Sequence, residues 1–106
     1  MAFARIVVPP SVARGATFEA RLSIRHPMET GFRVDDVGRT IPRNTLRSLV
    51  CRYNGTEVLR ASLGSGVAAN PYLRFFVTAR DSGPLVFEWI DDAGEAGSAQ
   101  AQIVVT

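Results

Sequence analysis

Apolar and polar residues alternate strictly along Thr17–Arg25, with apolar side chains at the even positions and polar ones at the odd positions. The apolar members are Phe18, Ala20, Leu22 and Ile24. Because successive side chains of an extended chain point to opposite faces, this period of two predicts a strand with one face in the core. The same alternation recurs along Leu85–Ile90 and Ala99–Val105 and predicts two further strands.

Turn sequences join neighbouring strands into hairpins. The string "DDAGEAG" separates the last two strands, and its Asp and Gly content suits a hairpin loop. Asn54 and Gly55 separate Leu46–Tyr53 from Thr56–Leu63, and both residue types tolerate the positive φ of a type I′ turn. We therefore predict a second hairpin, whose register is set by this turn.

Two more segments, Ala2–Val8 and Tyr72–Ala79, complete a set of about seven short strands with turn residues at roughly 8–12-residue spacing. No segment has the apolar stripe of an amphipathic helix. A chain of 106 residues can enclose one hydrophobic core but not that core and a second folded unit. The sequence therefore predicts an all-β protein, an immunoglobulin-like antiparallel β-sandwich that forms a single domain over residues 1–106.

The apolar faces of these strands predict which side chains share the core between two sheets packed about 10 Å apart. They are Phe18, Leu22, Ile24, Leu85, Phe87, Trp89, Ile103 and Val105. The aromatic residues of the later strands are also expected in the core, namely Tyr72, Phe75, Phe76, Phe87 and Trp89.

The charge distribution narrows the class of partner. All 12 basic residues are Arg, the acids number 10, and the two signs are mixed along the chain, which leaves a net charge of +2 without a basic block. This argues against nucleic acid or an anionic membrane as the main partner.

The N-terminal "MAFARIVVPP" lacks the pattern of a signal peptide, and no apolar run reaches about 20 residues. These features alone predict a soluble cytoplasmic protein.

The longest segment outside the predicted strands is His26–Arg43, which has two Pro and two Gly and is expected to run over one end or along one edge of the sandwich. His26 and Met28 are soft metal ligands that face the same way on an extended backbone. No further His or Cys cluster completes a set of three or four ligands, so we predict no metal and no cofactor. The structural interpretation is a corner in which the His26 side chain bonds to loop backbone and Pro27 ends the preceding strand.

Cys51 is the only cysteine, which excludes an internal disulfide and leaves a free thiol or an intermolecular bond. A nucleophile pair of Cys51 and His26 is the sharpest enzyme hypothesis, since a thiolate needs a neighbouring base or cation to react at neutral pH. Against it, Cys51 lies inside a predicted strand, where a thiol is commonly a small buried hydrophobe. A thiol enzyme or redox protein stays the alternative function.

Several strings spread in order along the chain resemble the SoxZ family. They are "HPMETG" at His26–Gly31, then Ile41-Pro42-Arg43, "YNG" followed by Glu57-Val58, Ala69-Asn70-Pro71, Ser82-Gly83-Pro84-Leu85 and Trp89. The similarity runs from about Arg5 to Val105, and its most specific part is the six-residue "HPMETG". The resemblance implies an immunoglobulin-like β-sandwich, which agrees with the strand pattern.

The resemblance also implies a function. SoxZ-like chains are non-catalytic subunits that pair with SoxY in the periplasmic SoxYZ carrier of thiosulfate oxidation, and SoxY bears the cysteine that holds sulfur intermediates. The C-terminal "AQAQIVVT" lacks such a Gly-Cys arm and matches the non-carrier subunit. The family exports this subunit together with SoxY, so periplasmic replaces cytoplasmic as the expected location.

The segment His26–Arg43 is the expected partner surface, because edge strands of a sandwich need cover and long loops supply it. We expect it to shape the contact with SoxY or the face to which other Sox enzymes dock transiently. The candidate residues are His26, Met28, Glu29, Phe32 and Arg33, with Cys51 as a possible intermolecular thiol.

Overall fold

Seven strands and no helix make up the part of the chain that the computed structural model describes, residues 3–26, 28, 32, 34–41, 44–63 and 71–106. The strands are β1 Phe3–Val7, β2 Thr17–Arg25, β3 Leu46–Tyr53, β4 Thr56–Ser62, β5 Tyr72–Thr78, β6 Gly83–Asp91 and β7 Ala96–Ile103. No helix long and apolar enough to cross a membrane occurs in these ranges. The all-β prediction is confirmed.

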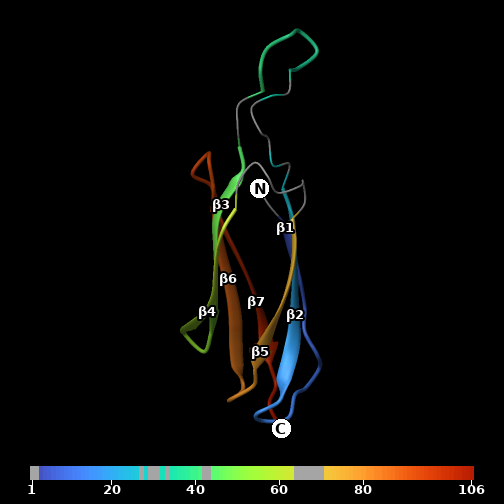
Figure 1. Ribbon diagram of the computed structural model, residues 1–106, viewed down its shortest axis with the longest axis vertical. Coiled ribbons are helices and arrows are strands. Elements are labelled where there is room, and N and C mark those ends of the chain that lie inside the picture. The colour runs from blue at the N-terminus through green and yellow to red at the C-terminus, as the bar shows by residue number, and fades with distance from the viewer. Residues whose placement is uncertain (1–2, 27, 29–31, 33, 42–43, 64–70) are drawn as a thin grey trace.

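The strands form two antiparallel sheets with the orders β1-β2-β5 and β4-β3-β6-β7 (Figure 1). Lettered A, B, C, C′, E, F and G in chain order, these sheets read A-B-E and C′-C-F-G, which is an immunoglobulin-like arrangement. Edge-to-face ring pairs join the sheets across the core, Phe18 with Tyr53 at 6.2 Å and Phe75 with Phe87 at 5.9 Å between ring centres. The predicted sandwich is therefore observed.

The predicted core is confirmed except at its last member. Seven of the eight side chains are buried, whereas Val105 is half-buried because it lies beyond the end of β7. The predicted type I′ turn is also present, since Asn54 and Gly55 have φ values of 51° and 82°.

Two aromatic residues of β5 were expected in the core and lie outside it. Tyr72 is 58% exposed and Phe76 is 65% exposed. The strand alternates, so that Leu73, Phe75 and Val77 point inward and the even-numbered side chains point away from the opposite sheet. The alternation along β5 decides which of its side chains are buried, and the prediction that Tyr72 and Phe76 lie in the core was wrong.

The two sides of the sandwich differ. On one side the chain beyond β7 is joined to the β1–β2 connection, where the Val12 N–H donates to the Val104 carbonyl at 2.9 Å and the Thr106 N–H donates to the Val12 carbonyl at 2.9 Å. On the other side β4 and β5 are the outermost strands, and a cleft of about 510 Å³ lined by Tyr53, Val58 and Phe76 lies there. Within the described residues, one side of the sandwich is therefore covered by the chain and the other side is open.

The molecule is long and narrow, with extents of 57 × 20 × 19 Å. Figure 1 shows why, because the segment around Val34–Thr40 stands far beyond the sheets at one end of the long axis. We call this segment, together with Phe32 shortly before it in the chain, the tip.

Candidate functional site

His26 and Asp91 form a buried pair at the base of the tip, where both residues are 4% exposed. The His26 Nε2 atom lies 3.2 Å from Asp91 Oδ2, and the Met28 N–H donates to His26 Nδ1 at 3.1 Å. Because Nδ1 accepts a hydrogen bond, the hydrogen of the neutral ring is on Nε2 and points at the carboxylate. Both ring nitrogens are thus occupied within the protein, and His26 has a structural role.

Met28 is tied to the sandwich by its own side chain. Its φ of 52° is unusual for a residue other than glycine, and this turn places the side chain in the core at 4% exposure. There the Leu46 N–H, at the start of β3, lies 3.3 Å from the Met28 sulfur. The predicted bond from the His26 side chain to loop backbone is confirmed, and Met28 fastens the same corner to β3.

A second set of bonds holds the return of the chain into β3. The Asp92 Oδ2 atom accepts hydrogen bonds from the Thr45 N–H and hydroxyl, both at 2.8 Å, and the Asp92 N–H donates to the Thr45 carbonyl at 2.9 Å. The Ala93 N–H donates to Asn44 Oδ1 at 3.3 Å. Both ends of the long segment are therefore fixed to the β6–β7 turn.

Asp91 is a buried carboxyl group that is held by several hydrogen bonds. Burial acts to raise the pKa of its carboxyl, but hydrogen bonds from the Glu95 N–H, His26 and the Ala93 N–H outweigh it and lower the pKa overall. The Glu95 N–H bond, to Oδ1, is 2.9 Å long. Asp91 is ionised at neutral pH in this environment.

This lowered pKa gives the stability a pH dependence. A carboxyl with a lower pKa in the folded state contributes stability above its unfolded pKa of about 3.9, and loses it as the pH falls through the folded pKa. We expect wild-type stability to fall more steeply below about pH 4 than that of Asp91→Asn. Urea titrations at pH 2.5–7 would measure both, with Asp36→Asn on the tip as the exposed control. If the free energy of unfolding changed with pH in the same way for wild type and Asp91→Asn, the lowered pKa of Asp91 in the folded state would be contradicted.

The tip is an ordered turn. The Asp35 carboxylate accepts hydrogen bonds from the Val37 and Arg39 N–H groups at 3.0 and 2.9 Å, and the Asp35 N–H donates to the Arg39 carbonyl at 2.8 Å. Gly38 supplies a φ of 83°. The apolar side chains of this end are open to solvent, with Phe32 89%, Val37 71% and Val34 62% exposed. A fixed backbone thus presents an apolar surface away from the core.

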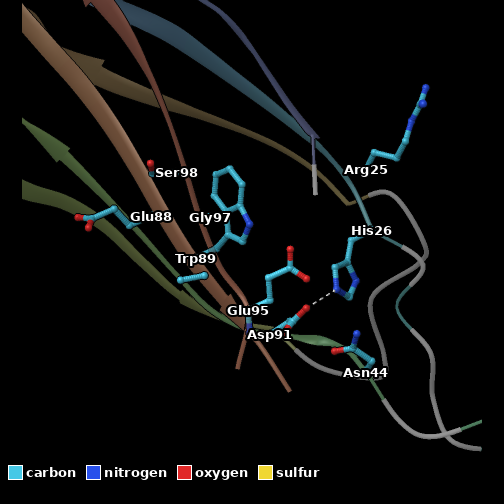
Figure 2. Close-up of a pocket in the computed structure, with 10 residues that line it drawn as sticks. Arg25, His26, Asn44, Glu88, Trp89, Asp91, Glu95, Gly97 and Ser98 are labelled. Carbon is cyan, nitrogen blue, oxygen red and sulfur yellow. Dashed lines mark hydrogen bonds and ion pairs between the residues drawn. The ribbon is translucent and has the colours of Figure 1, made fainter. Parts of the chain in front are cut away.

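A cleft of about 640 Å³ lies beside the buried pair (Figure 2). In this view the Trp89 indole and the His26 ring stand on opposite sides, with the Glu95 carboxylate between them. Trp89 lies directly over Gly97, where an added Cβ would be 2.5 Å from two indole ring atoms. Gly97 is therefore required by the packing of Trp89.

Cys51 lies in the middle of β3, fully buried and with a free thiol. Burial raises the pKa of this thiol to about 12. Cys51 pairs with Phe87, four residues before Asp91 on β6, so about 13 Å of strand separates it from the His26 corner. The Cys51–His26 nucleophile pair is contradicted, and the thiol is not placed to bond to another chain.

The structure sorts the predicted surface residues into three groups. His26 and Met28 are buried and support the loop from below, so little of either side chain is open to a partner. Phe32 is exposed, and Glu29 and Arg33 lie outside the described residues. Within the described ranges, no group of three or more His, Cys, Asp or Glu side chains is placed to hold a metal ion.

Sequence reasoning missed Asp91, which it treated as part of a hairpin loop. Asp91 is 65 residues from His26 and is surrounded in the sequence by residues typical of a turn. The available signal was that two acids follow directly on a strongly alternating strand, at the position where the strand leaves the core.

Comparison with known proteins gives one family. The family model described as "Sulphur oxidation protein SoxZ" matches residues 6–102. Among curated proteins, none matches the chain.

Solved structures with the same fold include the superoxide reductase (neelaredoxin) of Ignicoccus hospitalis, with a TM-score of 0.72 at 21% identity over 97% of this chain and 80% of that one. A putative superoxide reductase of Thermotoga maritima has a TM-score of 0.72 at 15% identity over 97% and 85%. The neelaredoxin of Archaeoglobus fulgidus has a TM-score of 0.60 at 20% identity over 93% and 88%. At such identities the likeness concerns the fold alone.

Proposed function

The chain belongs to the SoxZ family, and from this premise we propose that it is the non-catalytic subunit of a SoxYZ sulfur carrier. It binds SoxY and helps present the cysteine-bound sulfur intermediates of SoxY to other Sox enzymes. The observation that carries the proposal is the tip, an ordered turn with three apolar side chains exposed. Such a surface on a small soluble domain suits a partner contact.

The base of the tip supports this role. The buried His26–Asp91 pair, the Met28 anchor and the Asp92–Thr45 bonds fix both ends of the segment to the sandwich. A contact surface held in place before binding loses less conformational entropy on association. His26 and Met28, the described residues of the "HPMETG" string, thus support the partner surface.

The chemistry of the chain points the same way. Its single thiol is buried with a raised pKa, and both nitrogens of its single imidazole are hydrogen-bonded internally. We therefore assign the thiol that carries sulfur to the SoxY subunit. For the location we propose the periplasm, reached by export together with SoxY, on the strength of family membership.

Co-expression with a SoxY candidate, followed by size-exclusion chromatography and mass measurement, tests the proposal directly. A stable one-to-one complex is expected. Separate elution of the two chains at micromolar concentration would overturn the function.

Truncating the tip should weaken this complex. We expect Phe32→Ala combined with Val37→Ala to raise the dissociation constant for SoxY at least about thirtyfold, since even one buried hot-spot side chain contributes about 2 kcal/mol or more. The isolated variant should unfold within about 0.5 kcal/mol of wild type because both side chains are exposed. Calorimetric titration and a thermal melt measure the two quantities.

The matched control is Val7→Ala combined with Val104→Ala. These side chains are 43% and 45% exposed and lie away from the tip. An equal loss of affinity in the control pair, or none in the tip pair, would remove the tip from the interface.

A further inference from the structure

Within the described residues, strand β5 is paired with β2 on one edge and with no strand on the other, and the hydrogen bonds at its ends identify which backbone groups face this free edge. The Ile24 N–H donates to the Pro71 carbonyl at 2.9 Å, and the Ala79 N–H donates to the Ala16 carbonyl at 2.8 Å. The backbone groups of odd-numbered residues therefore point to β2. Because these directions alternate along an antiparallel strand, the N–H and C=O groups of the even residues point to the free edge. These are Tyr72, Arg74, Phe76 and Thr78.

Three of these four residues carry side chains suited to a protein contact. Tyr72 and Phe76 are more than half exposed, and Arg74 lies between them. Tyr, Phe and Arg are the residue types enriched in protein interfaces. An unprotected edge of this length is a template for pairing with another chain, and native proteins normally cover such an edge.

The outer face of the β1-β2-β5 sheet is basic. Its exposed arginines are Arg5, Arg21, Arg25 and Arg74. The only acid among the described residues of this face is Glu19, which forms ion pairs with Arg21 and Arg74. Four positive charges and one negative charge leave +3, more than the +2 of the whole chain. In the opposite sheet Arg52–Glu88 and Arg60–Glu57 are balanced pairs.

The free edge of β5 also borders the open side of the sandwich. A strand added to β5 would point its inward side chains into the cleft lined by Tyr53, Val58 and Phe76. It would point its outward side chains beside Arg74. The added strand would therefore need an apolar inward face and at least one carboxylate on its outward face.

We propose that β5 receives an extended segment of the SoxY partner by antiparallel or parallel strand addition, with a carboxylate of that segment against Arg74 and an apolar side chain in the cleft. The inference rests on the proposed function and names a second part of the same interface. Continuity supports it, because the start of β5 is bonded to Ile24, two residues before the His26 corner from which the tip extends. Tip and edge can then contact one partner along the molecule.

A second copy of this chain is a poorer occupant of the edge. Pairing two β5 strands would bring two outer faces of charge +3 into one continuous sheet, where like charges repel. An acidic segment is complementary to the same face. The charge therefore favours the partner subunit over self-association.

Two substitutions at one position separate backbone pairing from side-chain contact. Phe76→Ala removes the ring and keeps the edge-facing N–H, whereas Phe76→Pro also removes this donor and blocks the edge. We expect Phe76→Ala to weaken SoxY binding about tenfold and Phe76→Pro about tenfold more. The control is Ser62→Pro on the β4 edge, whose N–H points outward because the neighbouring Leu63 N–H bonds to β3. The affinity of Ser62→Pro for SoxY should equal that of wild type.

Equal affinities for Phe76→Pro and Phe76→Ala would overturn strand addition while leaving the SoxY complex, and with it the proposed function, intact. Failure of wild type to bind SoxY would overturn both. Amide hydrogen exchange on the wild-type complex gives a readout that needs no variant, should Phe76→Pro fail to fold. Protection of the Tyr72, Arg74, Phe76 and Thr78 amides on binding is expected, and unchanged exchange at all four would overturn the proposal. A concentration-dependent dimer of the chain alone, lost in Phe76→Pro, would assign the edge to a second copy and overturn it as well.

Discussion

His26→Ala is expected to lower the free energy of unfolding by about 3 kcal/mol, a large fraction of the 5–15 kcal/mol typical of small domains. The substitution leaves the Asp91 carboxylate buried without its imidazole partner and the Met28 N–H without its acceptor. Urea denaturation followed by the fluorescence of the single tryptophan, Trp89, measures the loss.

The neighbouring exposed residue supplies the control for this change. Arg25→Ala should alter stability by no more than about 0.5 kcal/mol. Adding Asp91→Asn to His26→Ala should recover part of the loss, because the unpaired charge is then gone. A loss below about 1 kcal/mol for His26→Ala, with no coupling to Asp91→Asn, would mean that the pair does not hold this corner.

Gly97→Ala is expected to destabilise the fold by about 2–3 kcal/mol. The new Cβ would lie 2.5 Å from the Cε2 and Nε1 atoms of Trp89, a residue that is 4% exposed. A ring held in a core cannot move by several tenths of an ångström without disturbing its neighbours, and overpacking of this kind typically costs about 1–3 kcal/mol. Urea denaturation measures this loss of stability, and a shift in Trp89 emission should accompany it.

Ser98→Ala is the matched control, since Ser98 is the next residue of β7 and is exposed. If the clash is the cause, Gly97→Ala should cost much less in a Trp89→Leu background, where the smaller side chain leaves room for the methyl group. Equal costs in the two backgrounds would show that β7 tolerates no side chain there for some other reason.

The strands could be predicted because their burial follows a local rule. The bounds of β2, predicted from its alternation, and of β3, predicted from the Asn54-Gly55 turn, agree with the structure residue for residue. β7 begins at Ala96, three residues before the predicted start, because its first inward residue is Gly97 and glycine gives no apolar signal. Glycine is needed at position 97 because the Trp89 ring of the neighbouring strand occupies the space of a side chain there, and a local sequence pattern does not reveal this contact.

The site was less predictable because its bonds are between distant residues. The sequence indicated a corner at His26, but the partner that makes the corner rigid, Asp91, belongs to a turn-like string with several acids and glycines. The exposure of Phe76 was mistaken for burial because aromatic character was given more weight than strand parity. The first case depended on a contact between distant residues, whereas the second followed from the alternation along β5 itself.

The burial of Cys51 gives the protein a built-in reporter of global unfolding. A thiol with a pKa of about 12 in a central strand does not react with an alkylating reagent while the fold is intact. Labelling then requires opening of the core, and its rate reports the population of the unfolded chain when reclosing is fast. The labelling rate would thus report the stability of the chain inside an assembled complex, where tryptophans of a partner would obscure the fluorescence signal.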